Sequence, residues 1–441
     1  MAYSGRLMKR SNFFTGRLAK LKFHHFLFGL FFVAWCIAYF TGISSVPFHP
    51  DEATQIYMST DVDQILAGNF NSFVYDQTQQ DSLIQKYHLL DAPLTRYKIG
   101  IARALTNSPQ LLQDWNWSNS WQGNSSALPD SKLLLVSRIS IAIFLPISLI
   151  LFFLLTRKLF SQPVAIIASL LFCFNSLLLL HTRRAMAEGL LIFFLILSLY
   201  LILNLPSNWY SLTALPVAFA FNSKQTMIVL VGFAFFALLV KQRHRLKQMV
   251  IQVLLFSLIF IGIFYLFNPV VWQKPVQVIR AMWMERSELT NSQLAVISTA
   301  APDFIVSSPL ERITALIAQV FIVPPATADV ANYQEELTNS VTAYFKNPIN
   351  DGYGRNMNVG FLYFFLVIFG VITSFNASNH QKTLLFLVFL SVIFEILFFF
   401  QIPFQRYYLV LIPFTCLYAA VGLENIFQFA KSHITSGKKV V

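Results

Sequence analysis

Residues 132–156 read KLLLVSRISIAIFLPISLILFFLLT, and this stretch decides the fold. Lys132 and Arg138 are its only charged residues. About 20 consecutive apolar residues in a helix, each adding about 1.5 Å, cross the hydrocarbon core of a bilayer. Similar runs recur along most of the chain, so the sequence predicts a membrane protein built from helices.

Composition supports this class. The chain has 441 residues, of which 56% are hydrophobic and only 12% are charged. Soluble domains carry about 25% charged residues, so an ordinary cytosolic enzyme, a disordered protein and a fibrous protein are excluded. The net charge of +12 is typical of cytoplasmic loops beside anionic lipids, and no basic soluble domain indicates nucleic-acid binding. Cys36, Cys173 and Cys416 all lie in apolar runs and indicate neither a disulfide framework nor a zinc site.

Nine apolar runs have roughly the length of a membrane span, and the weaker run 209–221 is favoured as a tenth. The nine are 24–45, 132–156, 162–181, 187–205, 224–240, 248–268, 358–375, 383–402 and 407–427. The first is too long for a signal peptide and lacks a small-residue cleavage site, so we interpret it as a retained anchor. We therefore expect one all-α, polytopic domain over 1–441, with both termini on one side of the membrane.

The distribution of Lys and Arg sets the orientation. Basic clusters at 6–22, 157–158, 241–247 and 431–439 all fall on one side if ten spans are counted. The positive-inside rule places that side, and both termini, in the cytoplasm. Two long segments, 46–131 and 269–357, then become outer loops.

Both outer loops contain stretches typical of interfacial helices. Residues 81–106 space their apolar side chains helically, and Arg96, Lys98 and Arg103 follow. We interpret this stretch as a helix lying in the interface with its cations toward phosphate headgroups, and simple anchoring accounts for it equally well. In the second loop, 275–284 and 310–323 are weakly apolar and are expected along the membrane, and 351–355 has turn chemistry.

Two adjacent carboxylates, Asp51 and Glu52, come directly after the first span. In a partly desolvated cleft, one carboxylate can act as a base whose pKa is tuned by the other and by nearby cations. The alternative is a helix start, where acids interact favourably with the helix dipole.

Further charged residues fall at the outer membrane boundary. Arg183, Arg184, Glu188, Lys224 and Arg406 all map to span ends on that side. The alternative for the cations is snorkelling to headgroups. The simpler hypothesis is that these charged side chains all face one cavity. The acids would then abstract a proton, and the cations would bind a phosphate.

The order of these motifs resembles the GT-C superfamily of polyprenyl-phosphate-sugar-dependent glycosyltransferases, including protein O-mannosyltransferases and the lipid A aminoarabinose transferase. The resemblance rests on Asp51-Glu52, Ser137-Arg138-Ile139, Arg157-Lys158-Leu159-Phe160, Arg184 to Glu188, Phe221-Asn222-Ser223-Lys224, and Arg406-Tyr407-Tyr408-Leu409 with Pro413. Two positions depart from the pattern. Asp91-Ala92-Pro93-Leu94 replaces a Pro-Pro-Leu element often preceded by a cation, and Glu188 stands where many relatives carry Asp.

The resemblance implies an enzyme that moves a sugar from a polyprenyl monophosphate to a hydroxyl of a lipid, glycan or protein on the outer face. Asp51 is the expected base of an inverting displacement, with Glu52 and Glu188 orienting the acceptor or the base. Lys224, Arg183, Arg184, Arg406 and Tyr407 are expected to bind the donor phosphate. A divalent metal beside the acids is compatible with this chemistry but not required. The expected location is a bacterial plasma membrane, and the rival functions are a transporter, a flippase, or a ligase of lipid-linked glycans.

Overall fold

A computed structural model describes residues 28–79, 82–328, 333–375 and 379–437. Every regular element in these ranges is a helix, which confirms the predicted all-α class. The chain divides into two units, 1–44 and 45–441. The described part of the first unit contains the apolar helix Phe28–Thr41. All other elements belong to the second unit.

Six helical segments of the described residues are long and apolar enough to cross a membrane. They are Ser131–Leu159, Gln225–Gln242, Leu246–Phe267, Met357–Ser374, His380–Phe399 and Gln405–His433. Shorter apolar helices cover Phe28–Thr41, Gln162–Cys173 and Glu188–Asn204. The count of ten spans and the cytoplasmic placement of the termini therefore stay predictions.

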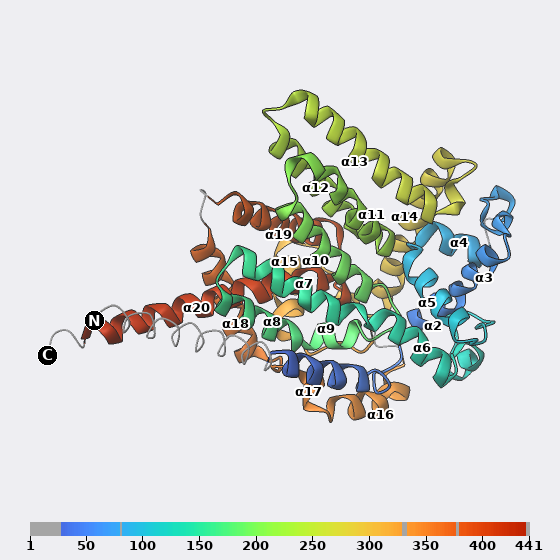
Figure 1. Ribbon diagram of the computed structural model, residues 1–441. Coiled ribbons are helices and arrows are strands. Elements are labelled where there is room, and N and C mark those ends of the chain that lie inside the picture. The colour runs from blue at the N-terminus through green and yellow to red at the C-terminus, as the bar shows by residue number, and fades with distance from the viewer. Residues whose placement is uncertain (1–27, 80–81, 329–332, 376–378, 438–441) are drawn as a thin grey trace, which may run out of the picture. The chain divides into compact units, whose positions relative to one another are not determined.

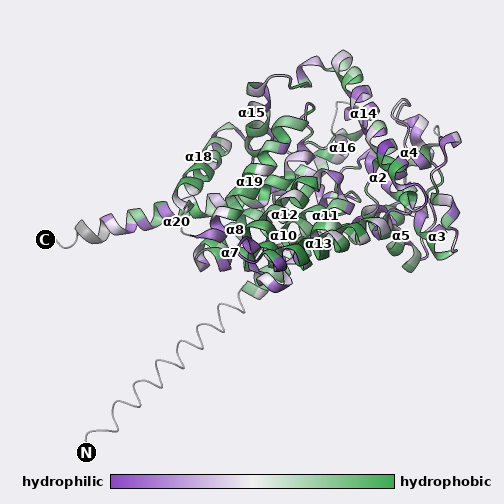
Figure 2. Ribbon diagram, turned by 90° about the horizontal axis from the view of Figure 1, so that it is seen from above, coloured by the Kyte–Doolittle hydropathy of each residue, from purple (hydrophilic) through white to green (hydrophobic). Residues whose placement is uncertain are grey.

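The helices of the apolar segments follow one another closely and pack side by side (Figure 1). Figure 2 shows apolar residues along most of α10, α12 and α13. The bounds are α6 (Ser131–Ala142), α7 (Phe144–Leu159), α8 (Gln162–Cys173), α9 (Ser176–His181), α10 (Glu188–Asn204), α11 (Ala214–Ser223), α12 (Ile228–Gln242), α13 (Leu246–Phe267), α18 (Met357–Ser374), α19 (His380–Phe399) and α20 (Ile412–Gly437).

One expected span is interrupted. The run 162–181 was expected to form a single helix, but α8 ends at Cys173 and α9 begins at Ser176. Asn175 causes the break, because its side-chain oxygen accepts hydrogen bonds from the backbone N–H groups of Leu177 and Leu178. Asn is among the preferred residues at a helix start, and here it overrides the apolar pattern.

Helix ends predicted to face the same side of the membrane meet in the structure. The Gln381 side chain donates to the Leu203 carbonyl over 2.7 Å, and the Lys241 ammonium donates to the Leu205 carbonyl. At the opposite ends, the Tyr97 hydroxyl of the first outer loop donates to the Phe267 carbonyl at the end of α13 over 3.1 Å. The first outer loop therefore lies against the ends that were predicted to be external.

The first outer loop folds into short helices. They are α2 (Pro50–Tyr57), α3 (Asp61–Leu66), α4 (Leu83–Leu90) and α5 (Leu94–Leu105). The helix expected over 81–106 is thus present in two parts. Its break falls at Asp91 to Pro93, since a proline ring disfavours helical backbone in the residue before it.

Two of the three cations of α5 do not point toward headgroups, contrary to the prediction. Arg96 and Arg103 are buried. The Arg96 Nε lies 2.7 Å from Asp61, whose carboxylate also contacts the His88 ring at 3.0 Å, and Arg103 pairs with Asp63. The anchoring interpretation is therefore wrong for these two arginines, because acids of α3 compensate their charge inside the loop.

The second outer loop is dominated by one long helix. Residues 275–284 are only the first part of α14 (Pro275–Ala300), because no helix breaker follows Pro275 for 25 residues. Val278 of α14 packs with Leu89 of α4 in a small apolar cluster, which places the two outer loops side by side (Figure 1). The remaining helices of this loop are α15 (Pro309–Ile317), α16 (Gln334–Phe345) and α17 (Pro348–Asp351), and a π-helical turn covers Ala318–Ile322.

Candidate active site

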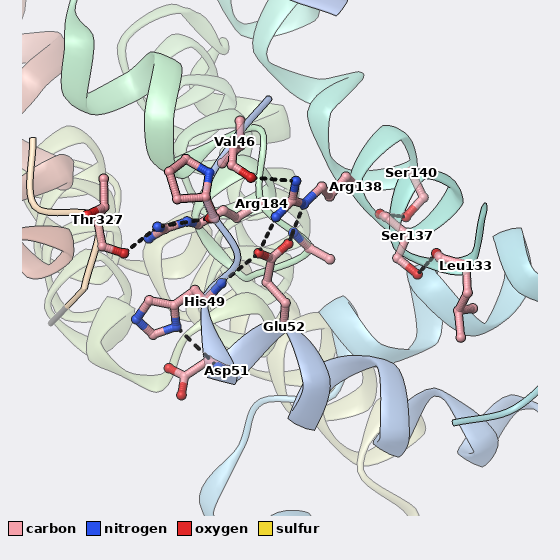
Figure 3. Close-up of polar contacts among 12 residues, drawn as sticks. Val46, His49, Asp51, Glu52, Leu133, Ser137, Arg138, Ser140, Arg184 and Thr327 are labelled. Atoms are coloured by element: carbon pink, nitrogen blue, oxygen red, sulfur yellow. Dashed lines mark hydrogen bonds and ion pairs between the residues drawn. The ribbon is translucent and has the colours of Figure 1, made fainter. Parts of the chain in front are cut away.

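Asp51 and Glu52 stand in the first turn of α2, so the helix-start alternative describes their local structure. His49 caps this helix: its Nδ1 accepts from the Asp51 backbone N–H over 3.1 Å, and its own N–H donates to Glu52 over 3.1 Å. Pro50 supplies the first helical residue, where a missing N–H costs nothing. The two acids leave this turn in different directions (Figure 3).

Glu52 points into a dry site and makes an ion pair with Arg138 of α6. The guanidinium donates to the two carboxylate oxygens over 2.7 Å and 2.8 Å, and it also donates to the Val46 carbonyl over 2.9 Å. The Ala185 backbone N–H donates to Glu52 over 3.0 Å. Figure 3 shows this network joining the chain before α2 to α6.

This environment keeps Glu52 ionised. Burial by itself raises the pKa of the Glu52 carboxyl, but the charges of Arg138 and Arg184 and the hydrogen bonds outweigh it and hold that pKa below its usual range. A fully buried carboxylate with both oxygens occupied is suited to holding the fold together.

Arg183 and Arg184 are also buried and serve the second outer loop. Arg183 donates to the Asn350 side chain over 2.6 Å. Arg184 donates to the Thr327 carbonyl over 2.5 Å and to the Pro47 carbonyl over 3.3 Å. The alternative that Arg183 and Arg184 snorkel to lipid headgroups is therefore wrong. Both arginines hold distant segments together near the end of α9.

A cavity of about 600 Å³ lies between the two outer loops and the helix ends. Five of the eight residues predicted for the site line it, namely Asp51, Glu188, Lys224, Arg406 and Tyr407. Glu52, Arg183 and Arg184 are not among its lining residues. The structure thus brings acids and cations from α2, α10, the end of α11 and the segment before α20 to one chamber.

The charged residues of the cavity are arranged as two ion pairs. Arg406 pairs with Asp51, and the Lys224 ammonium donates to Glu188 over 3.0 Å. The Lys224 nitrogen also lies 4.9 Å from the centre of the Tyr407 ring, within cation–π range. Glu188 accepts one of the three N–H donors of Lys224, and the lysine keeps an exposed surface in the cavity.

The lysine is positioned by a break in the helical backbone. α11 ends at Ser223, and Lys224 adopts an extended conformation with φ −156° and ψ 123° before the chain turns into α12. Lys224 can therefore reach the cavity from the boundary of two apolar segments.

One wall of the cavity comes from α14 and was not predicted from the sequence. Arg286, Leu289, Gln293 and Val296 line it at spacings of three and four residues, which places them on one helix face. Arg286 also donates to the Leu90 carbonyl at the end of α4. The sequence signal for this wall was the interfacial helix predicted over 275–284. The sequence does not show which other parts of the molecule this helix contacts.

Two acids of the first outer loop, Asp91 and Asp114, contact the cavity lining or belong to it. Asp91 lines the cavity and accepts from the Gln55 amide over 3.4 Å, and Asp114 accepts from the Tyr87 hydroxyl over 2.5 Å. Burial raises the pKa of both carboxyls above their usual range. Asp91 therefore faces the cavity with a raised pKa, whereas Asp114 is not among the lining residues and contacts the lining residue Tyr87.

No residue is assigned as a metal ligand. Within the described ranges, no group of three or more His, Cys, Asp or Glu side chains has the arrangement of a metal site. The cations that face the cavity come from the protein itself, in Lys224, Arg286 and Arg406.

Comparison with known proteins agrees with the predicted resemblance over part of the chain. Residues 129–272 match the family model described as dolichyl-phosphate-mannose-protein mannosyltransferase. This segment contains four of the six motifs, among them those of Arg138, Glu188 and Lys224, and the match confirms the resemblance to GT-C glycosyltransferases there. Asp51 and Arg406 lie outside the matched segment.

The oligosaccharyltransferase of the archaeon Archaeoglobus fulgidus is similar to the chain at low identity. Its apo form is 11% identical, with a TM-score of 0.47, and the match covers 93% of this chain and 52% of that one. Its complex with an inhibitory peptide and a dolichol-phosphate is 12% identical, with a TM-score of 0.41, covering 93% and 51%. The chain thus spans about half the length of these structures, and such low scores carry no argument about its function. No curated protein matches this chain.

Proposed function

We propose that this protein is an integral membrane glycosyltransferase that takes its sugar from a polyprenyl monophosphate. One observation carries the proposal. Asp51 and Lys224, which stand 173 positions apart in the sequence, line one cavity of about 600 Å³ at the ends of apolar helices. The family match over residues 129–272 supports the reaction class.

The proposed transfer reaction uses the Asp51 carboxylate and the cations Lys224 and Arg406, which line the same cavity. Asp51 takes the proton of the acceptor hydroxyl, and the acceptor oxygen attacks the anomeric carbon of the donor sugar. The bond from that carbon to the phosphate oxygen breaks, and the polyprenyl phosphate leaves with the electron pair. Direct displacement inverts the anomeric carbon.

Stabilisation of the leaving phosphate falls to Lys224 and Arg406. A phosphate leaving group needs charge neutralisation more than a proton, and preorganised cations in a site of low dielectric are effective at this task. Each of the two cations already has a carboxylate partner in the cavity. We infer that the donor phosphate shares them with Glu188 and Asp51, so that phosphate binding loosens the hold on Asp51 and frees it to act as base.

The outer loops place the acceptor. Tyr407 and Phe404 lie beside the two cations, whereas α2, α4 and α5 form the side of the cavity away from the apolar helices. In this arrangement the lipid chain of the donor stays in the outer leaflet, and the acceptor enters from the outer aqueous face. A bacterial plasma membrane is the proposed location.

The test is sugar transfer in vesicles that contain the purified protein and a panel of polyprenyl-phosphate hexoses and pentoses. Asp51→Asn keeps the size and much of the hydrogen bonding of Asp51 but cannot accept the proton. General base catalysis is worth roughly 10²–10⁴-fold in rate, and we expect a loss in that range with the protein still inserted.

Asp130→Asn is the matched control in the same outer loop. Asp130 caps α6 through the Lys132 and Leu133 backbone N–H groups and does not line the cavity, and Asn caps helices as well as Asp. Its transfer rate should stay at the native level. Near-native transfer by Asp51→Asn would refute Asp51 as the base and move that role to Glu188.

A further inference from the structure

The wall of the cavity that comes from the first outer loop is rich in uncharged hydrogen-bonding groups. Thr54, Gln55, Tyr87 and Thr95 all line it. Thr95 is only 1% exposed, and its hydroxyl has no hydrogen-bond partner among the described residues; the same holds for the Gln55 side-chain oxygen. A buried polar group without a partner costs free energy. This wall is therefore suited to a ligand that brings its own hydroxyl groups.

An aromatic ring stands at the edge of the same wall. Trp117 lines the cavity and is 43% exposed. Its ring lies 6.4 Å from that of Tyr333 and 6.5 Å from that of His49, the residue that caps the helix of Asp51. Tyr333 in turn donates to the Asn119 carbonyl over 2.9 Å, so both outer loops hold the indole in place.

Building on the proposed function, we propose that this wall is an acceptor subsite and that the acceptor is a carbohydrate. The apolar C–H face of a sugar ring fits an exposed indole, and its rim of hydroxyls pairs with hydroxyl, amide and carboxylate groups, since each hydroxyl both donates and accepts. Trp117 is the stacking residue, and Gln55, Asp91 and Thr95 bind the rim.

A polypeptide acceptor fits this wall less well. Extended peptides are commonly bound by adding a strand to a sheet edge, and the described ranges contain no strand to extend. The hydrogen-bonding groups of the wall are side chains in a concave space, which is typical of sites that bind small rings with a few placed polar groups.

The position of Asp51 indicates that the wall takes the acceptor and not the donor. Lys224 and Tyr407 line the same cavity from the ends of apolar segments, where the donor phosphate is proposed to bind. The Asp51 carboxylate pairs with Arg406, and the Asp51 backbone N–H donates to His49, whose ring lies 6.5 Å from that of Trp117. A sugar on Trp117 thus gives its hydroxyl proton to Asp51 while its oxygen bonds to the anomeric carbon and the polyprenyl phosphate departs.

The experiment compares acceptors in the purified, vesicle-embedded protein. The probes are octyl hexopyranosides and a serine-containing peptide, each with the donor that supports transfer, and release of sugar to water is followed without any acceptor. Glycosides should be glycosylated, and the peptide should not.

Variants of the wall then test the assignment. Aromatic contacts are worth roughly 0.5–1.5 kcal/mol, and a tenfold change corresponds to about 1.36 kcal/mol. Trp117→Ala should therefore raise the KM for the glycoside by up to about tenfold, with a smaller change in kcat, and Trp117→Phe should recover part of the loss. Trp209→Ala removes an exposed tryptophan outside the cavity and should have no effect.

A second pair of variants covers the buried hydroxyl. Thr95→Val keeps the shape of the side chain and should raise the KM for the glycoside, whereas Thr95→Ser keeps the hydroxyl and should stay near native. Transfer to the peptide alone, or an unchanged glycoside KM in both Trp117→Ala and Thr95→Val, would overturn the carbohydrate acceptor while leaving donor cleavage intact. Absence of both transfer and release to water in the native protein would instead refute the proposed function, and this inference with it.

Discussion

Two carboxylate–guanidinium pairs begin at adjacent residues of α2 and differ in nearly every physical respect. Glu52 and Arg138 have side chains that are 0% and 2% exposed. Arg138 also donates to the Val46 carbonyl, and the Ala185 N–H donates to Glu52. Asp51 and Arg406 are 30% and 15% exposed and face the cavity. Identical chemical groups thus serve two purposes, because one pair is enclosed by protein and the other borders open space.

The difference indicates how the site is built. A buried ion pair repays its desolvation only when the geometry is good and the remaining donors are satisfied, and breaking it costs much more than breaking an exposed pair. The Glu52 pair meets these conditions and fixes α2 against α6. Asp51, one residue earlier, is thereby held rigidly at the cavity wall, as the role proposed for it requires.

The largest expected effect is on the stability of the protein, which should depend much more on the Glu52–Arg138 pair than on the Asp51–Arg406 pair. Glu52→Ala leaves the Arg138 charge buried without its partner, which typically costs about 3–5 kcal/mol. We expect a large drop in thermal stability in detergent, or failure to insert. Asp51→Ala, at the partly exposed pair, should cost less, because Arg406 borders the open cavity and keeps contact with water there. Equal losses for the two variants would break the comparison.

The next effect concerns transfer and not stability. Lys224→Gln removes a charge-assisted hydrogen bond, worth roughly 1.5–3 kcal/mol, so transfer should fall about 10- to 150-fold with protein level normalised. Lys132→Gln is the control, because Lys132 is exposed at the start of α6 and lies outside the cavity. Equally small losses at both lysines would contradict a phosphate site at Lys224.

The smallest effect is a difference in pH dependence between paired and cavity-lining acids. Burial raises the pKa of Asp61, but Arg96 and His88 outweigh it, so the pKa of Asp61 is lowered and its stabilisation is lost only as the pH falls below about 3.8. The pKa of Asp91 is raised, mainly by burial, so its ionisation opposes folding and its protonation restores stability as the pH falls toward 3.8.

Melting curves in detergent at a series of pH values measure this difference. Relative to Asp91→Asn, the native protein should become more stable between pH 7 and about 4. Relative to Asp61→Asn, it should lose its advantage only as the pH falls below about 3.8. Parallel curves for the native protein and Asp91→Asn would contradict the raised pKa of Asp91.

Several features could be predicted from the sequence because they depend on local pattern. Apolar runs of span length predict continuous helices wherever no capping residue intervenes. The prediction of a continuous helix over 162–181 was wrong at Asn175, because its side-chain oxygen accepts hydrogen bonds from backbone N–H groups and starts a new helix there. Charge at the span ends indicated where Asp51, Glu188, Lys224 and Arg406 would meet. Arg286 could not be found in this way, since it lies in the middle of α14 and not at the end of an apolar run.

The sequence by itself determined the all-α class, the apolar segments and the set of charged residues at their ends, because hydropathy and residue spacing act over a few helical turns. Only the tertiary structure decided what each charge does. Glu52, Arg183 and Arg184 turn away from the cavity into dry hydrogen-bond networks, whereas Asp51 and Lys224 face it. Neighbouring residues on a helix point in directions about 100° apart, from 3.6 residues per turn, and the fold alone decides which direction meets protein and which meets open space.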